Sequence, residues 1–147
     1  MNTHPDFEEL LKLLEENGVE YMIVGGYAVA YHGHARFTND MDLFFRPTSE
    51  NVHRLRKALV RFGFREEDLP LKNFLEEGNI LTFGVEPTRI DLMNKIDGIS
   101  FEKAASGVVH GRYGEVEVTF IGYKELLENK KSTQRIKDRA DLEQLEG

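Results

Sequence analysis

Three aspartates lie in apolar stretches of the sequence, where an unpaired carboxylate is costly. Asp40 and Asp42 stand in the run 40–45, and Asp91 stands in the run 89–93. Because side chains alternate along a strand, Asp40 and Asp42 should share one face, about 7 Å apart. Neighbouring carboxylates repel each other and lose hydration unless a cation lies between them. The pattern therefore predicts a divalent-cation site, and Mg²⁺, which carboxylates hold together with substrate phosphates, fits it.

Asp91 adds a third acid if its strand lies beside that of Asp40 and Asp42. Three carboxylates can hold two Mg²⁺ ions about 4 Å apart, with Mn²⁺ as an alternative, to activate a hydroxyl and stabilise a leaving pyrophosphate. A purely structural interpretation instead pairs Asp91 with a base such as Arg89. The pair Gly25-Gly26, between an apolar run and a short helical one, allows backbone N–H groups to approach phosphate oxygens. A Gly-Gly pair alone is more typical of a turn.

The hydrophobic spacing indicates which elements position these residues. It predicts helices over 7–14, 27–31, from the segment 47–50 to Gly63, and over 68–77, 123–131 and 135–145. Asp6 is expected to cap the first helix, and Thr48 or Ser49 the third. Apolar or alternating runs predict strands over 19–24, 36–45, 80–85, 88–93 and 116–121. This order favours an α+β (α/β) fold with a mixed central sheet and helices packed on it.

Composition and length restrict the class of protein. The 147 residues suit one domain over 1–147, with C-terminal helices over about 123–147. The absence of cysteine excludes disulfides, thiolate metal sites and cysteine nucleophiles. No apolar run approaches a membrane span of about 18 residues, and the N-terminus lacks signal-peptide features, so we expect a cytoplasmic protein without membrane contact. A net charge of −7 argues against nonspecific nucleic-acid binding, although 46–65 and 124–139 are locally basic.

The central motif resembles that of a known superfamily. Gly25-Gly26, followed by Asp40-Met41-Asp42-Leu43 in hydrophobic flanks, is similar to the signature of the DNA polymerase β-like nucleotidyltransferases. The closing segments 126–130 and 135–142 resemble the last helices of small bacterial and archaeal stand-alone members, including the nucleotidyltransferase-like toxins of abortive-infection and toxin–antitoxin systems. The resemblance covers nearly the whole chain and implies a polymerase β-like fold. The chain departs from many relatives in carrying Gly26 where they carry serine.

The resemblance implies a role for each matched residue. Asp40, Asp42 and Asp91 would be catalytic metal ligands, with Asp91 as the third ligand or as the general base on the acceptor hydroxyl. The residues that match nucleotide-binding positions are Gly25, Gly26, Arg36, Thr38, Lys130 and Asp138. Judged by sequence position alone, Lys130 would be part of a solvated helix end.

These patterns predict a Mg²⁺-dependent nucleotidyltransferase with a toxin-like role. It would move a nucleoside monophosphate from an NTP to an acceptor hydroxyl and release pyrophosphate. Two alternatives stay open: a non-catalytic nucleotidyltransferase-fold component of a toxin–antitoxin complex, and a glycosyltransferase that binds nucleotide sugars. The intact acids count against the first and the short chain against the second. The acceptor is open among tRNA, a protein hydroxyl and a small molecule, and the short chain suggests a homodimer or a partner protein.

Overall fold

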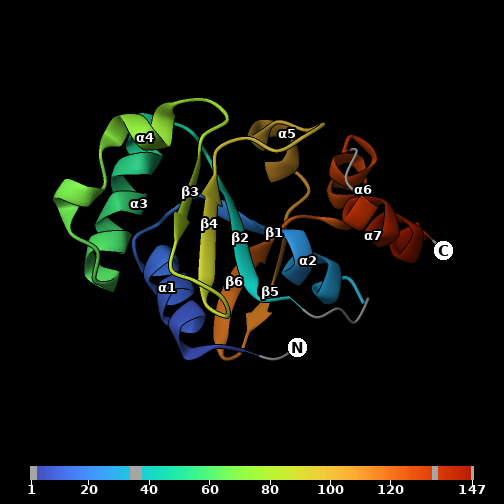
Figure 1. Ribbon diagram of the computed structural model, residues 1–147, viewed down its shortest axis with the longest axis horizontal. Helices are drawn as coiled ribbons and strands as arrows, with labels where there is room; N and C mark the ends of the chain where they lie inside the picture. Colours follow the sequence, from blue (N-terminus) through green and yellow to red (C-terminus); the bar gives the residue numbers. More distant parts are fainter. Residues whose placement is uncertain (1–2, 34–37, 134–135, 147) are drawn as a thin grey trace.

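The computed structural model describes residues 3–33, 38–133 and 136–146, in which a six-stranded sheet forms the centre (Figure 1). The strands are β1 (Tyr21–Val24), β2 (Asp40–Phe45), β3 (Ile80–Phe83), β4 (Arg89–Met93), β5 (Val109–Tyr113) and β6 (Val116–Phe120). Their order in the sheet is β3-β4-β2-β1-β6-β5. The pairs β2–β4 and β1–β6 are parallel, and the other three pairs are antiparallel. The predicted mixed sheet is confirmed.

Helices cover both faces of this sheet. Those in the described part of the chain are α1 (Pro5–Glu16), α2 (Gly25–Tyr31), α3 (Ser49–Phe62), α4 (Leu71–Leu75), α5 (Phe101–Ala105), α6 (Tyr123–Lys131) and α7 (Ile136–Glu146), with a 3₁₀ turn η1 (Glu66–Asp68). Figure 1 shows α1 and α3 on one side of the sheet and α2, α6 and α7 on the other. Within residues 3–33, 38–133 and 136–146, no helix combines the length and hydropathy that a bilayer span requires.

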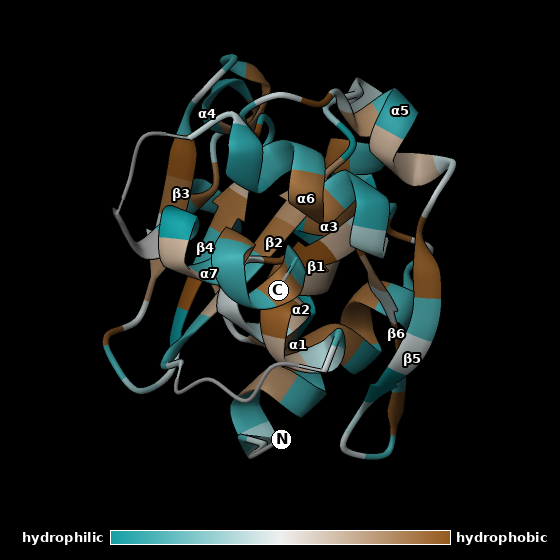
Figure 2. Ribbon diagram, turned by 90° about the vertical axis from the view of Figure 1, so that its right-hand side faces the viewer, coloured by the Kyte–Doolittle hydropathy of each residue, from teal (hydrophilic) through white to brown (hydrophobic). Residues whose placement is uncertain are grey.

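The alternation of β2 divides its side chains between the two faces of the sheet. Phe45 contacts Phe74 of α4, with ring centroids 6.2 Å apart, whereas Phe44 contacts Phe101 of α5 at 5.0 Å. Met41 and Leu43 lie on the same face as Phe45 and are buried. Asp40 and Asp42 share the face of Phe44. In Figure 2 the central strands are hydrophobic, and the turns of α6 and α7 that lie in front of them are largely hydrophilic.

Several element ends differ from the sequence-based expectation. Helix α1 begins at Pro5 without a side-chain cap, so the predicted Asp6 cap is wrong. Proline suits the first helical turn because its ring fixes φ and it has no N–H to satisfy. Thr48 does cap α3, since its hydroxyl accepts from the Asn51 backbone N–H at 3.3 Å. Strand β1 begins only at Tyr21, and neither α5 nor β5 was expected from the sequence pattern.

Candidate active site

The two strands that carry the aspartates lie side by side near the middle of the sheet. β2 and β4 are parallel, and their register places Asp42 opposite Asp91 and Asp40 opposite Arg89. Opposite residues on paired strands project from the same face. Asp42 and Asp91 are therefore neighbours on that face. The structure thus brings Asp40, Asp42 and Asp91 together. Asp40 and Arg89, which contact each other, are 49 positions apart in the sequence.

The glycine pair lies directly against these carboxylates. β1 ends at Val24, and Gly25 begins α2 with a φ of +68°, in the left-handed region that favours glycine. A Cβ built on Gly25 would overlap the Asp42 carboxylate. A Cβ on Gly26 would come within 2.7 Å of the Thr38 hydroxyl. The chain therefore needs glycine at both positions for the turn to pack against β2 and its leading segment.

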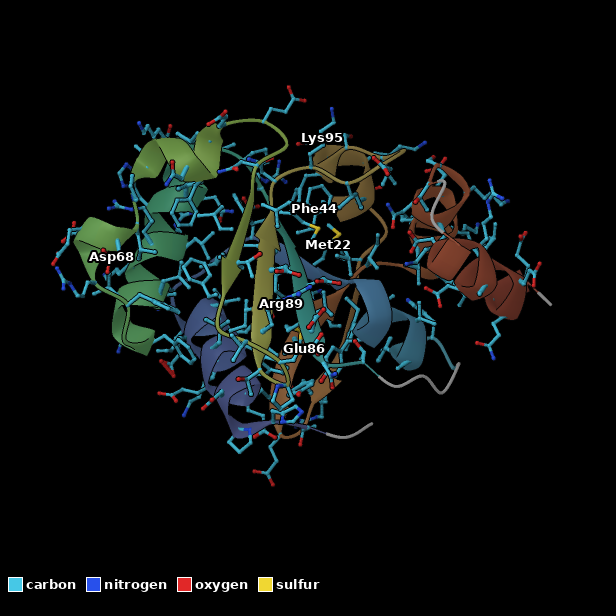
Figure 3. All side chains as sticks on the ribbon, viewed as in Figure 1. Met22, Phe44, Asp68, Glu86, Arg89 and Lys95 are labelled. Carbon is cyan, nitrogen blue, oxygen red and sulfur yellow. The ribbon has the colours of Figure 1, made fainter. Side chains whose placement is uncertain are left out.

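Arg89 joins two of the three carboxylates. One terminal guanidinium nitrogen of Arg89 lies 2.8 Å from Asp40 Oδ2 and 3.2 Å from Asp91 Oδ2. The other oxygen of Asp91 accepts a 2.7 Å hydrogen bond from the Thr82 hydroxyl of β3. Among the described residues, Asp40 Oδ1 and Arg89 Nε are buried atoms without a hydrogen-bond partner. Arg89 thus compensates the acidic cluster but leaves one carboxylate oxygen unsatisfied. Figure 3 labels Arg89 beside β4, the strand that begins with this residue.

Burial makes the carboxyl groups of Asp40 and Asp42 harder to ionise. Burial raises the pKa of Asp42 to about 7, and the charge of Asp91 adds to the rise. The ammonium of Lys130 acts in the opposite direction on the pKa of Asp42. Burial also raises the pKa of Asp40, while the Arg89 charge opposes that rise. A nearby divalent cation would favour the ionised form of every carboxylate in the cluster.

Lys130 reaches the same cleft from α6. Its side chain is buried, with Nζ 2.5 Å from Asp138 Oδ1 and 3.3 Å from Asp141 Oδ2 of α7. The Thr133 hydroxyl donates to the second oxygen of Asp138 at 3.0 Å. Two carboxylates therefore hold one ammonium at the edge of the cleft, which is a buried ion pair and not a solvated helix end.

The residues converge on a cleft of about 310 Å³. Its lining comprises Val24, Gly25 and Gly26, the three aspartates, Ile80, Arg89, Met93, the segment Lys95 to Asp97, Asn129 and Lys130. In the described part of the chain, no three His, Asp or Glu side chains stand ready as a metal-binding group. Arg89 contacts one oxygen of Asp40 and one of Asp91, and Asp40 Oδ1 keeps no hydrogen-bond partner among the described residues.

The other sequence-predicted site residues lie around this cleft in different ways. Thr38 lies against Gly26 and is not part of the cleft lining. Asp138 contacts Lys130, and the cleft lining does not include it. Arg36 falls outside the described residues.

Sequence reasoning missed two residues that hold the site together, Thr82 and Asp141. The signal for Asp141 was present, because its spacing of three residues from Asp138 places both on one face of a helix. Thr82 could be found only through the register of β3 on β4, in which it is paired with Asp91.

Comparison with known proteins gives the fold and the family of the chain. None of the curated proteins matches the sequence. Among solved structures, the chain is similar to the lincomycin-bound crystal structure of the lincosamide antibiotic adenylyltransferase LnuA, with a TM-score of 0.57 and 15% identity. The match covers 100% of this chain and 99% of that one. This likeness confirms the predicted nucleotidyltransferase fold. A family model matches residues 3–145, so the chain belongs to the family described as "Nucleotidyl transferase of unknown function (DUF2204)".

Proposed function

We propose that the protein is a Mg²⁺-dependent nucleotidyltransferase that moves a nucleoside monophosphate from an NTP to an acceptor hydroxyl. The observation that carries this proposal is the meeting of Asp40, Asp42 and Asp91 on one sheet face, against the Gly25 turn. Membership of a nucleotidyl transferase family supports it. The structural neighbour is an adenylyltransferase by name, so ATP is the donor to test first.

The residues present fit a divalent cation of the Mg²⁺ type. The donor set consists of carboxylate oxygens, and Asp40 Oδ1 is buried without a partner. Asp40, Asp42 and Asp91 would hold the ion, with Arg89 giving up its contacts to two of them. When bound, the cation would polarise the phosphates and lower the cost of charge on the leaving pyrophosphate.

The chain's own groups would position the remaining parts of the reaction. The first N–H groups of a helix have no acceptor within it, so those of Gly25 and Gly26 can bind phosphate oxygens. Lys130, held by Asp138 and Asp141, faces the cleft with a charge suited to phosphate. Arg89, once released from the carboxylates, can also pair with the triphosphate, because it lines the same cleft.

These groups account for each bond and for the proton in the transfer step. The acceptor oxygen bonds to the α-phosphorus as the bond from that phosphorus to the bridging oxygen breaks, and pyrophosphate leaves with the electron pair. The acceptor's proton passes to a carboxylate oxygen, a role that we assign to Asp91. This choice follows from its place on β4, whose end leads to Lys95 and Ile96 at the margin of the cleft.

The experiment compares Asp42→Asn with Asp68→Asn, an exposed aspartate remote from the cleft. Each protein receives α-³²P-labelled NTPs with Mg²⁺ and three acceptor pools: tRNA, cell protein and small alcohols. We expect pyrophosphate release and label transfer by the parent and by Asp68→Asn, and a loss on the order of 100-fold or more in Asp42→Asn. Equal transfer by Asp42→Asn would refute the proposal.

One observation favours a non-catalytic relative. Arg89 contacts one oxygen each of Asp40 and Asp91, as in an ordinary structural ion pair. In that case NTP and Mg²⁺ would leave the melting temperature unchanged. The toxin-like role, the cytoplasmic location and a homodimer or partner protein stay predictions from the sequence.

A further inference from the structure

A second and larger cavity lies next to the carboxylate cleft. Its volume is about 610 Å³, and it shares Lys95 and Ile96 with the cleft. It opens where the parallel strands β2 and β4 end, the edge at which ligands bind in parallel sheets. Figure 3 shows Phe44 and Lys95 beyond Arg89, toward this end of β4 and near α5.

The cavity and the aspartates share one face of the sheet. Phe44, which lines the cavity, follows Asp42 by two residues on β2, a step of about 7 Å. In the register of β2 on β4, Asp42 is opposite Asp91 and Phe44 is opposite Met93. A molecule held against Phe44 can therefore extend one hydroxyl to Asp91 without leaving this face.

The chemistry of the lining is apolar and locally neutral. Six of its eleven residues are apolar: Phe44, Pro47, Leu75, Ile96, Ile99 and Phe101. Its charged pair, Lys95 and Glu77, lies with Nζ and Oε1 3.4 Å apart, so the two charges offset each other.

The remaining polar side chains of the lining are engaged within the protein. The Asn94 amide accepts from the Gly78 N–H and donates to the carbonyls of Phe74 and Glu76. The Ser100 hydroxyl caps α5. Binding of RNA requires an excess of positive charge for its phosphate backbone, and this lining has none.

We propose that this cavity is the acceptor site and that the acceptor is a small neutral alcohol with an aromatic or aliphatic ring. The inference rests on the proposed nucleotidyl transfer and adds the class of the second substrate. The volume is typical of sites for small organic ligands. Phe44 and Phe101 meet edge to face and form the aromatic part of the lining. The alcohol oxygen then attacks the α-phosphorus, its proton passes to Asp91, and pyrophosphate leaves.

The test uses 2-phenylethanol as the probe and phenylacetate, the same ring with a negative charge, as the matched control ligand. Leu75→Trp fills the cavity from α4. Pro47→Trp fills it from an exposed position two residues after the end of β2. Leu71→Trp is the control variant, because Leu71 is half-buried on the same helix and does not line the cavity. Affinity of each ligand is measured by ligand-detected NMR, affinity for ATP with Mg²⁺ by calorimetry, and label transfer with α-³²P-ATP.

We expect the parent to bind 2-phenylethanol and to transfer AMP to it, with binding at least 10-fold weaker in Leu75→Trp or Pro47→Trp. Leu71→Trp should retain the parent's affinity within twofold, phenylacetate should bind weakly to every variant, and ATP affinity should stay within twofold throughout. Equal probe binding by all variants, or transfer of label to tRNA or protein alone, would overturn the acceptor site while nucleotidyl transfer stands. Failure of ATP and Mg²⁺ to bind the parent would reject nucleotidyl transfer itself and the acceptor role with it.

Discussion

Replacing Asp42 by asparagine is expected to abolish catalysis and, in protein freed of divalent cations, to stabilise the fold at neutral pH. Asp42 is packed against Gly25 and beside Asp91, so its ionised form is held close to other negative charge. Asparagine has nearly the same shape and carries no charge. The variant therefore keeps the packing and removes the repulsion between the carboxylates. Most other substitutions at an active site change both packing and charge.

The size of this stabilisation follows from the pKa of Asp42. Because the folded pKa of about 7 exceeds the unfolded value of 3.8, the protonated carboxyl favours folding. That contribution is complete below the unfolded pKa and is lost as the pH rises through the folded one. A rise from 3.8 to about 7 corresponds to roughly 4 kcal/mol at about 1.36 kcal/mol per pKa unit. The stability of Asp42→Asn relative to the parent should thus increase by up to about 4 kcal/mol between about pH 4 and pH 8.

Urea denaturation in EDTA across this pH range measures the difference directly, with Asp68→Asn as the control whose curve should parallel that of the parent. A second series with Mg²⁺ should stabilise the parent at about pH 8 more than it stabilises Asp42→Asn, because the ion binds the folded carboxylates. A difference between Asp42→Asn and the parent that does not change with pH would refute the reasoning.

Three further substitutions test other contacts of the site. Gly25→Ala should abolish turnover, because the added methyl overlaps the carboxylate of a cleft aspartate. It should also cost more stability than the roughly 1–2 kcal/mol expected of the control Gly18→Ala, whose glycine has a similar left-handed φ and open space around it. Equal losses of unfolding free energy in urea would contradict this. Lys130→Met should destabilise by about 3–5 kcal/mol because it removes the buried ammonium that lies between the carboxylates of Asp138 and Asp141. The exposed Lys131→Met should stay within about 0.5 kcal/mol. Arg89→Met should tighten Mn²⁺ binding several-fold in EPR titrations, because the guanidinium that competes with the ion for Asp40 and Asp91 is removed. Weaker binding would instead show that Arg89 helps to hold the ion site in place.

The sequence was most informative where one local rule determined the structure. Strand alternation placed Asp40 and Asp42 on one face, and the cap at Thr48 followed from hydrogen-bonding chemistry within four residues. The short element α5 escaped prediction because five residues give too little periodicity to detect. β5 escaped because its sequence includes His110, Gly111 and Arg112, and only its pairing with β6 makes it a strand.

The tertiary parts of the site could not be read from local patterns. The sequence gives Arg89 as a neighbour of Asp91 along the chain, but its contact with Asp40 depends on the register of β2 on β4. Lys130 looks like a helix-end charge until α7 supplies two aspartates to bury it. The larger cavity draws its lining from several separate segments, so no motif indicates it.

The parallel pairing of β2 with β4 has a consequence for biosynthesis. Parallel neighbours require a long crossover, and here the two aspartates of β2 emerge from the ribosome well before Asp91. A nascent chain or proteolytic fragment that ends ahead of β4 carries an incomplete acid cluster without Arg89. Such a truncated product should have no catalytic activity. Activity would therefore become possible only after β4 has been synthesised and has paired with β2.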